Sequence, residues 1–214
     1  MNLSVTILRI YRGLTYYLSY LILELPRGLD ISLRSKANGI TLQGNHGYAL
    51  TSKSALKNML RDIPLKDKSL LDIGSGKGGA VIYAHQLGCK RAAGIEYEKF
   101  LHDIAVKNFS ILKLNPYCES FNMDARVFLN YACYDILFMF NPFDDDIYDD
   151  VVRQLASQIL RFDRTKDKYL ICYGGANIDA VNKTGLFSLV REDRCPHRGN
   201  MFRVFKTVNH AEAG

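Results

Sequence analysis

The chain has 214 residues with the composition of an ordinary soluble globular protein, 48% hydrophobic and 23% charged, and no repeat or low-complexity tract stands out. Its five cysteines are odd in number and form no C-x-x-C pair, which argues against a disulfide framework and indicates a cytoplasmic setting. The net charge of +6 comes from residues 1–68, which hold ten Lys/Arg against four Asp/Glu. Because the excess of basic residues is confined to this N-terminal third, the sequence does not predict a basic groove that binds nucleic acid.

The chain begins with an apolar stripe at helical spacing, formed by Leu3, Ile7, Ile10, Leu14, Leu18, Leu21 and Leu25. The uncharged run 13–23 is too short to span a bilayer, which takes ~20 helical residues. Two interpretations stay open: a helix packed on the following domain, or an interfacial helix over residues 3–25 that makes peripheral contact with the inner membrane face. Pro26 and Gly28 end the helix in either case. We expect residues 1–40 to form a basic, helical extension.

A regular alternation of elements predicts a domain over residues 41–210. A helix over 51–63 is capped by Thr51 or Ser52. Strands are predicted at 69–73, 91–96, 117–123, 134–140 and 168–174, and helices at 78–87, 98–112, 125–131, 145–161 and 176–183. This alternation indicates βαβ units in a parallel sheet, whereas strands 186–191 and 201–207 are joined only by a polar loop and predict an antiparallel hairpin. The fold class is therefore α/β, with a doubly wound, mostly parallel seven-stranded sheet that ends in a hairpin.

A glycine-rich loop follows the first strand, with glycines at Gly74, Gly76 and Gly78. The segment satisfies G-x-G-x-x-G, a weak signal for a nicotinamide or flavin dinucleotide. Asp72, two residues before the first glycine, favours another ligand, because a carboxylate gains nothing from facing a pyrophosphate and would bind the ammonium group of a sulfonium ligand. A P-loop is excluded, because no G-x-x-x-x-G-K-[ST] spacing is present.

Two further carboxylates end strands of the same sheet. Glu96 ends the second strand, where it can accept both hydroxyls of a ribose. Asp124 ends the third, where an adenine amino group would need an acceptor. Because open α/β sheets bind ligands at the carboxyl ends of their strands, three acids at that edge indicate a nucleoside-containing ligand.

The fourth strand ends in Asn141-Pro142-Phe143. Together with D-I-G-S-G-K-G and G-I-E, this motif resembles the class I S-adenosylmethionine-dependent methyltransferases, in particular a group of small bacterial ones, over residues ~44–207. The resemblance implies S-adenosyl-L-methionine as cofactor, bound by Tyr48, the three strand-end acids, the loop glycines and Asn141. It also implies that Asn141 orients the acceptor and that Phe143 forms one wall of its pocket. The chain has one proline where the related [DN]-P-P-[FYW] motif has two, so the preference for nitrogen does not carry over directly.

The leading hypothesis is thus a methyltransferase whose acceptor is unidentified: a protein lysine or other amine, a glycan or a small molecule. Two alternatives stay open, a nicotinamide-dependent oxidoreductase and a cofactor-binding partner protein without turnover. Cys195 and His197 have no second pair of metal-ligand type beside them, so no metal site is predicted.

Overall fold

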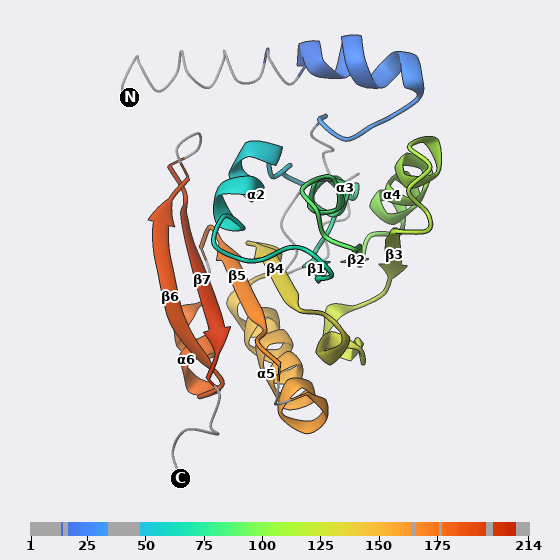
Figure 1. Ribbon diagram of the computed structural model, residues 1–214. Coiled ribbons are helices and arrows are strands. Elements are labelled where there is room, and N and C mark those ends of the chain that lie inside the picture. Colours follow the sequence, from blue (N-terminus) through green and yellow to red (C-terminus); the bar gives the residue numbers. More distant parts are fainter. Residues whose placement is uncertain are drawn as a thin grey trace.

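The structure is a computed structural model that describes Leu14 and residues 17–33, 48–163, 166–175, 177–195 and 199–208. Seven strands form one sheet in the order β3-β2-β1-β4-β5-β7-β6 (Figure 1). Strands β1 to β5 are parallel, and β7 runs antiparallel to both β5 and β6. The predicted doubly wound sheet with a C-terminal hairpin is therefore confirmed. The strands are β1 (Ser69–Ile73), β2 (Arg91–Glu96), β3 (Cys118–Asn122), β4 (Ile136–Phe140), β5 (Tyr169–Tyr173), β6 (Phe187–Arg194) and β7 (Met201–Thr207).

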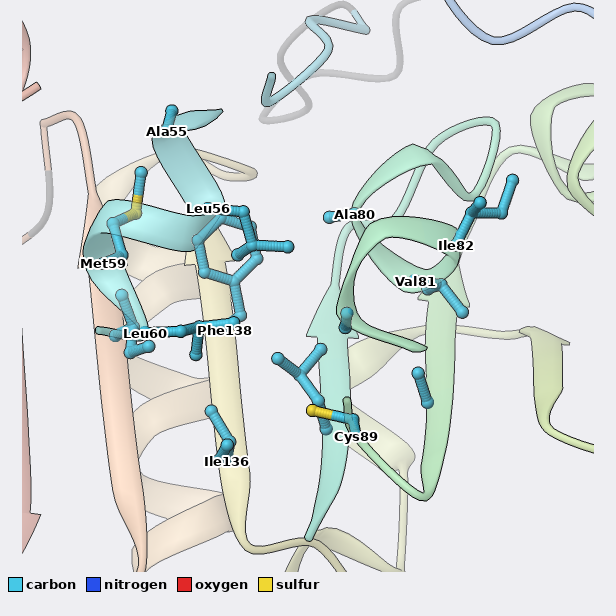
Figure 2. Packing of buried hydrophobic residues seen from close by; sticks show 14 of the residues in the cluster. Ala55, Leu56, Met59, Leu60, Ala80, Val81, Ile82, Cys89, Ile136 and Phe138 are labelled. Carbon is cyan, nitrogen blue, oxygen red and sulfur yellow. The ribbon is translucent and has the colours of Figure 1, made fainter. Parts of the chain in front are cut away.

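Helices cover both faces of the sheet, as alternate side chains of the central strands require. One buried cluster joins Leu70 and Phe138 to α2 (Lys53–Met59), α3 (Gly79–Gln86) and α4 (Lys99–Ile111). The other joins Leu71 and Leu137 to α5 (Asp145–Phe162) and α6 (Ile178–Lys183). Figure 2 shows part of the first cluster, with Leu56 and Met59 of α2 and the adjoining Leu60 beside Phe138 of β4, and with Ala80, Val81 and Ile82 of α3 over the neighbouring strands. Ser52 caps α2 by accepting a hydrogen bond from the Ala55 amide at 3.2 Å, which confirms one of the two predicted caps.

The predicted helix over 125–131 is wrong. The structure has two 3-10 turns there, η3 (Ala125–Val127) and η4 (Tyr131–Cys133). The Asp124 side chain caps the first turn, and Phe128 then takes an extended conformation and is buried against Tyr131 at a ring-centroid distance of 5.0 Å. Burial of this aromatic pair overrides the helical pattern of the local sequence.

Strand β6 extends further than the predicted 186–191. The ladder passes an irregularity between Leu189 and Arg191 and continues until Arg194 pairs with Met201. Arg191 donates hydrogen bonds to the carbonyl oxygens of Asn58 and Met59, at 2.8 and 2.6 Å. The hairpin therefore adds hydrogen bonds to two carbonyl groups at the C-terminal end of α2, where the helix offers few amide partners.

The N-terminal segment is helical from residue 17 to 27, through η1 (Tyr20–Glu24) and η2 (Leu25–Arg27). It ends at Gly28, whose φ of +72° is left-handed, as predicted. The stripe residues that the structure describes, Leu14, Leu18, Leu21 and Leu25, are exposed, so they do not pack on the domain. Leu3, Ile7 and Ile10 lie outside the described residues. Within the described part of the chain, no helix combines the length and apolar character needed to cross a bilayer.

Candidate functional site

The glycine loop turns tightly from β1 across the end of β2 into α3. The amides of Gly74 and Ser75 both donate to the carbonyl oxygen of Ile95 at 2.9 Å, and the Gly78 amide donates to that of Ser75 at 3.0 Å. Gly74, Gly76 and Gly78 all have positive φ, at 82°, 54° and 78°. The loop therefore brings its backbone to the carboxyl edge of the sheet with no side chain at these three positions.

Tyr48 lies directly against this loop. A Cβ atom on Gly76 would overlap the Tyr48 ring, so only glycine fits beneath it. The Tyr48 hydroxyl donates to the carbonyl oxygen of Ile31 at 2.6 Å, and the Lys77 ammonium group lies 5.5 Å from the ring centroid. Burial raises the pKa of Tyr48 well above its ordinary value, so its hydroxyl stays protonated and acts as a donor. The structure thus places Tyr48 at the predicted loop.

This contact predicts a large effect for Gly76→Ala. We expect it to lower the free energy of unfolding by about 2–4 kcal/mol, through strain at positive φ and overlap with Tyr48. Gly185→Ala is the matched control, because Gly185 has a φ of +62° but no atom within 4 Å of an added Cβ, and we expect it to cost only ~1–2 kcal/mol. Urea unfolding measures both. Equal losses for the two variants would show that the Tyr48 contact is not tight.

Asp72 is the most perturbed acid at this edge. It is 4% exposed, and no group of the described residues donates a hydrogen bond to its carboxylate. Burial, with the charge of Glu96 as a second cause, raises the pKa of Asp72 to about 8. A buried carboxyl group without donors is a marked exception among folded proteins, and such exceptions concentrate at functional sites.

Glu96 sits across from the loop and is already part of its structure. One carboxylate oxygen accepts from the Gly76 amide at 2.7 Å and the other from the Glu98 amide at 2.8 Å. Burial raises the pKa of Glu96, and these two backbone donors oppose the rise. Each carboxylate oxygen can accept a second hydrogen bond, so capacity for a ligand diol remains.

Asp124 differs from the other two acids because it has an internal cation. Its carboxylate accepts from the backbone amide of Arg126 at 2.8 Å and pairs with the Arg126 guanidinium at 2.6 Å. These contacts hold the pKa of Asp124 below its ordinary value, so it is ionised at neutral pH. Arg126 was not predicted as part of this site, although an arginine two residues after a strand-end acid is a visible signal.

The Asn141-Pro142-Phe143 turn packs between two glycine segments. Asn141 has a φ of +41°, an uncommon left-handed conformation for a residue other than glycine. A Cβ on Gly74 would lie 2.5 Å from the Cβ of Pro142, and one on Gly175 would lie 3.3 Å from the Asn141 Oδ1 atom. The loops after β1, β4 and β5 therefore meet at this turn.

Phe143 is partly buried against the core cluster beneath α5. Gly174 and Gly175, which lie against Asn141, were not predicted as part of the site, although two glycines directly after a strand signal a close backbone approach.

Residues 30–33 of the N-terminal segment, called the strap below, form hydrogen bonds with Lys77 of the glycine loop and with Tyr48. Lys77, only 1% exposed, donates to the Asp30 carboxylate at 2.6 Å and to the Leu33 carbonyl oxygen at 3.0 Å. Asn108 of α4 joins both partners, because its amide group donates to the carbonyl oxygens of Asp30 and Lys77. Ile31 belongs to the same buried cluster as α2 and α3. No sequence pattern signalled this strap, which joins residues 47 positions apart.

Several solved structures with the same fold are methyltransferases of low sequence identity. An RNA methyltransferase from Salinibacter ruber, in complex with S-adenosyl-L-homocysteine, is 17% identical, with a TM-score of 0.61 over 78% of this chain and 98% of that protein. The ribosomal protein L11 methylase from Lactobacillus delbrueckii subsp. bulgaricus is 15% identical, with a TM-score of 0.55 over 75% and 81%. The mitomycin 7-O-methyltransferase MmcR is 13% identical, with a TM-score of 0.58 over 73% of this chain and 54% of that protein, so this chain matches about half of it.

No protein-family model matches the chain, and no curated protein matches it in sequence. At these identities the likeness concerns the fold, and it agrees with the strand order found here. The chain has the α/β fold of the class I methyltransferases.

Proposed function

We propose that the protein is an S-adenosyl-L-methionine-dependent methyltransferase. The observation that carries the proposal is the Asp72 carboxyl group, which is buried, has no hydrogen-bond donor among the described residues and lies two residues before the glycine loop. A dinucleotide pyrophosphate would be repelled by this group once it is ionised, whereas a ligand ammonium group would stabilise it. The fold of the compared methyltransferases supports this choice.

The remaining residues fit the same ligand. Glu96 keeps two acceptor sites for a ribose, and Asp124 would receive the adenine amino group if the Arg126 side chain moves aside. Gly74, Gly76 and Gly78 let the loop pack closely against Pro142, Tyr48 and Phe109, which holds its backbone beside Asp72 and Glu96. When bound, S-adenosyl-L-methionine supplies an electrophilic methyl group on a sulfonium, which an acceptor lone pair can displace.

The chain's own contribution to transfer would be to position the acceptor. Asn141 has a strained backbone conformation, its side chain lies against Gly174 and Gly175, and the next residue, Pro142, contacts Gly74 of the glycine loop. The Asn141 amide oxygen would accept a hydrogen bond from the acceptor and orient the lone pair, and Phe143 would form one wall. This arrangement fits an amine acceptor, such as a protein lysine, and fits a hydroxyl of a glycan or small molecule as the second choice.

The compared proteins do not decide the acceptor, because their names include RNA, a ribosomal protein and mitomycin. We place the activity in the cytoplasm, and we favour a protein or small-molecule acceptor over nucleic acid. The basic excess lies in residues 1–68, whereas residues 69–214 hold equal numbers of acidic and basic side chains.

Calorimetric titration tests the cofactor assignment. We expect S-adenosyl-L-homocysteine to bind saturably to the purified protein, NADH not to bind, and Asp72→Asn to lose the binding. Asp103→Asn is the matched control, because Asp103 is an exposed acid on α4 whose partner is Lys99. Binding of NADH alone would support the oxidoreductase alternative, and binding of neither ligand would refute the assignment. Binding without turnover against any acceptor would support the partner-protein alternative.

A further inference from the structure

The apolar side chains of the N-terminal helical segment, Leu14 and residues 17–27, are mostly exposed to solvent. Seven large apolar side chains of this segment are exposed: Leu14, Tyr17, Leu18, Leu21, Ile22, Leu23 and Leu25. The segment is π-helical over Tyr20–Glu24 and 3-10 over Leu25–Arg27, so these side chains form a broad exposed apolar face in place of a narrow α-helical stripe. Ile22 is 67% exposed, although isoleucine is among the residues most often buried in folded proteins. An exposed apolar face of this kind marks an interaction surface.

Residues 1–40, which include this segment, carry five Lys/Arg against two Asp/Glu. Glu24 is buried and accepts hydrogen bonds from the amides of Ile31 and Ser32, at 2.7 and 2.9 Å. Asp30 is paired with Lys77. Both acids of the segment are therefore used internally, whereas Arg27 at the end of the helix is exposed. The sequence adds four more cations nearby, Arg9, Arg12, Arg34 and Lys36, which lie outside the described residues.

We propose that this face, formed by Leu14 and residues 17–27, binds the surface of an anionic lipid bilayer. The leucine and isoleucine side chains would enter the boundary between headgroups and acyl chains, and Arg27 would face lipid phosphates. A second copy of the chain could cover the leucines, but it would bring two cationic segments together. Charge complementarity therefore favours an anionic membrane over self-association.

The strap fixes this face relative to the rest of the protein. Asp30 and Ile31 follow the helix directly and are held to the glycine loop by Lys77 and by the Tyr48 hydroxyl. Figure 1 shows the helix (blue) on the same side of the sheet as α3 and α4. A bilayer bound to the helix would therefore lie near the loop edge of the sheet. The inference does not depend on the proposed enzymatic activity.

Vesicle co-sedimentation of the full chain tests the proposal. We expect binding to vesicles of phosphatidylglycerol and phosphatidylcholine in equal parts, weaker binding to pure phosphatidylcholine, and a decrease with added salt. Ile22→Glu and Leu18→Glu should each lower the partition coefficient by roughly tenfold or more, because each removes an aliphatic side chain from the bilayer. Arg27→Glu should weaken binding to the anionic vesicles only.

Matched control variants on α5 distinguish binding through the N-terminal face from nonspecific adsorption of the protein to vesicles. Phe162→Glu removes a 65% exposed apolar side chain at the end of α5, and Arg153→Glu reverses an exposed charge on the same helix. Both should bind vesicles like the unchanged protein, and all variants should keep its melting temperature. No binding to anionic vesicles, or binding that Ile22→Glu and Leu18→Glu leave intact, would overturn the proposal. A dimer in light scattering that Ile22→Glu dissociates, without lipid binding, would assign the face to self-association instead.

Discussion

Asp72→Asn is expected to raise the free energy of unfolding at pH 8 by about 2–4 kcal/mol while abolishing the binding of S-adenosyl-L-homocysteine. Burial and the nearby Glu96 raise the pKa of Asp72 from 3.8 to about 8, which is a penalty on the folded state whenever this carboxyl group is ionised. Asparagine has nearly the same shape and no charge, so it removes the penalty. Its amide also lacks partners, which offsets part of the gain.

The sign of the pH dependence follows from the direction of the shift. Between pH 4 and 8 the folded protein keeps the Asp72 proton and the unfolded chain releases it, so the unchanged protein loses stability as pH rises through this range. The variant lacks this contribution. The difference in unfolding free energy should therefore be small near pH 4 and largest at pH 8 and above.

Urea unfolding at several pH values measures this difference, and calorimetry measures the loss of ligand. Asp103→Asn, on the exposed surface of α4, should change neither quantity by more than ~0.5 kcal/mol. A stabilised protein that no longer binds its ligand is the signature of a functional group held at a cost to the fold. If Asp72→Asn instead destabilises the protein, the carboxylate has a structural partner and its functional role fails.

The strands of this fold were predictable because their signals are local. The bounds of β1, β2 and β7 agree with the predicted ones, since each is an apolar run bounded by turn residues or charges. The error at 125–131 has a tertiary cause, because Phe128 leaves the helical conformation to pack beside Tyr131. The extension of β6 to Arg194 was missed because its outer residues are polar and are held by pairing with β7.

The site could be predicted only as a set of strand ends. That Asp72, Glu96 and Asp124 share one edge follows from the parallel topology alone. The different pKa shifts of the three acids do not follow from topology, because they depend on local hydrogen-bond donors. The Gly76 and Glu98 amides donate to Glu96, and the Arg126 guanidinium pairs with Asp124. Asp72 has no donor among the described residues.

The burial of Lys77 could not be predicted from the sequence either, because it depends on contacts with residues distant in the chain. A lysine inside a glycine loop suggests a contact with a ligand, yet here it fastens the N-terminal strap through Asp30. The exposed side of the first helix was also undetermined by sequence, because helical spacing defines a stripe but not what covers it.

The affinity for S-adenosyl-L-homocysteine is expected to rise about tenfold per pH unit from pH 6 to just below pH 8 and then to level off. In the free protein Asp72 is mostly protonated below its pKa of about 8. A ligand ammonium group pairs only with the ionised carboxylate, so binding must release the proton and becomes easier as pH rises. Calorimetry in buffers of different ionisation enthalpy should therefore detect close to one proton released per ligand bound near pH 7.

Methylthioadenosine provides the matched ligand control, because it keeps the adenosine and sulfur of S-adenosyl-L-homocysteine but has no ammonium group. Its affinity should not rise over this range, since it offers nothing that stabilises an ionised Asp72. The contacts proposed for Glu96 and Asp124 would be common to both ligands, so the difference between the two pH profiles isolates Asp72. Identical profiles for the two ligands would mean that the ammonium group binds elsewhere, and Asp72 would then lose its assigned role even if both ligands bind.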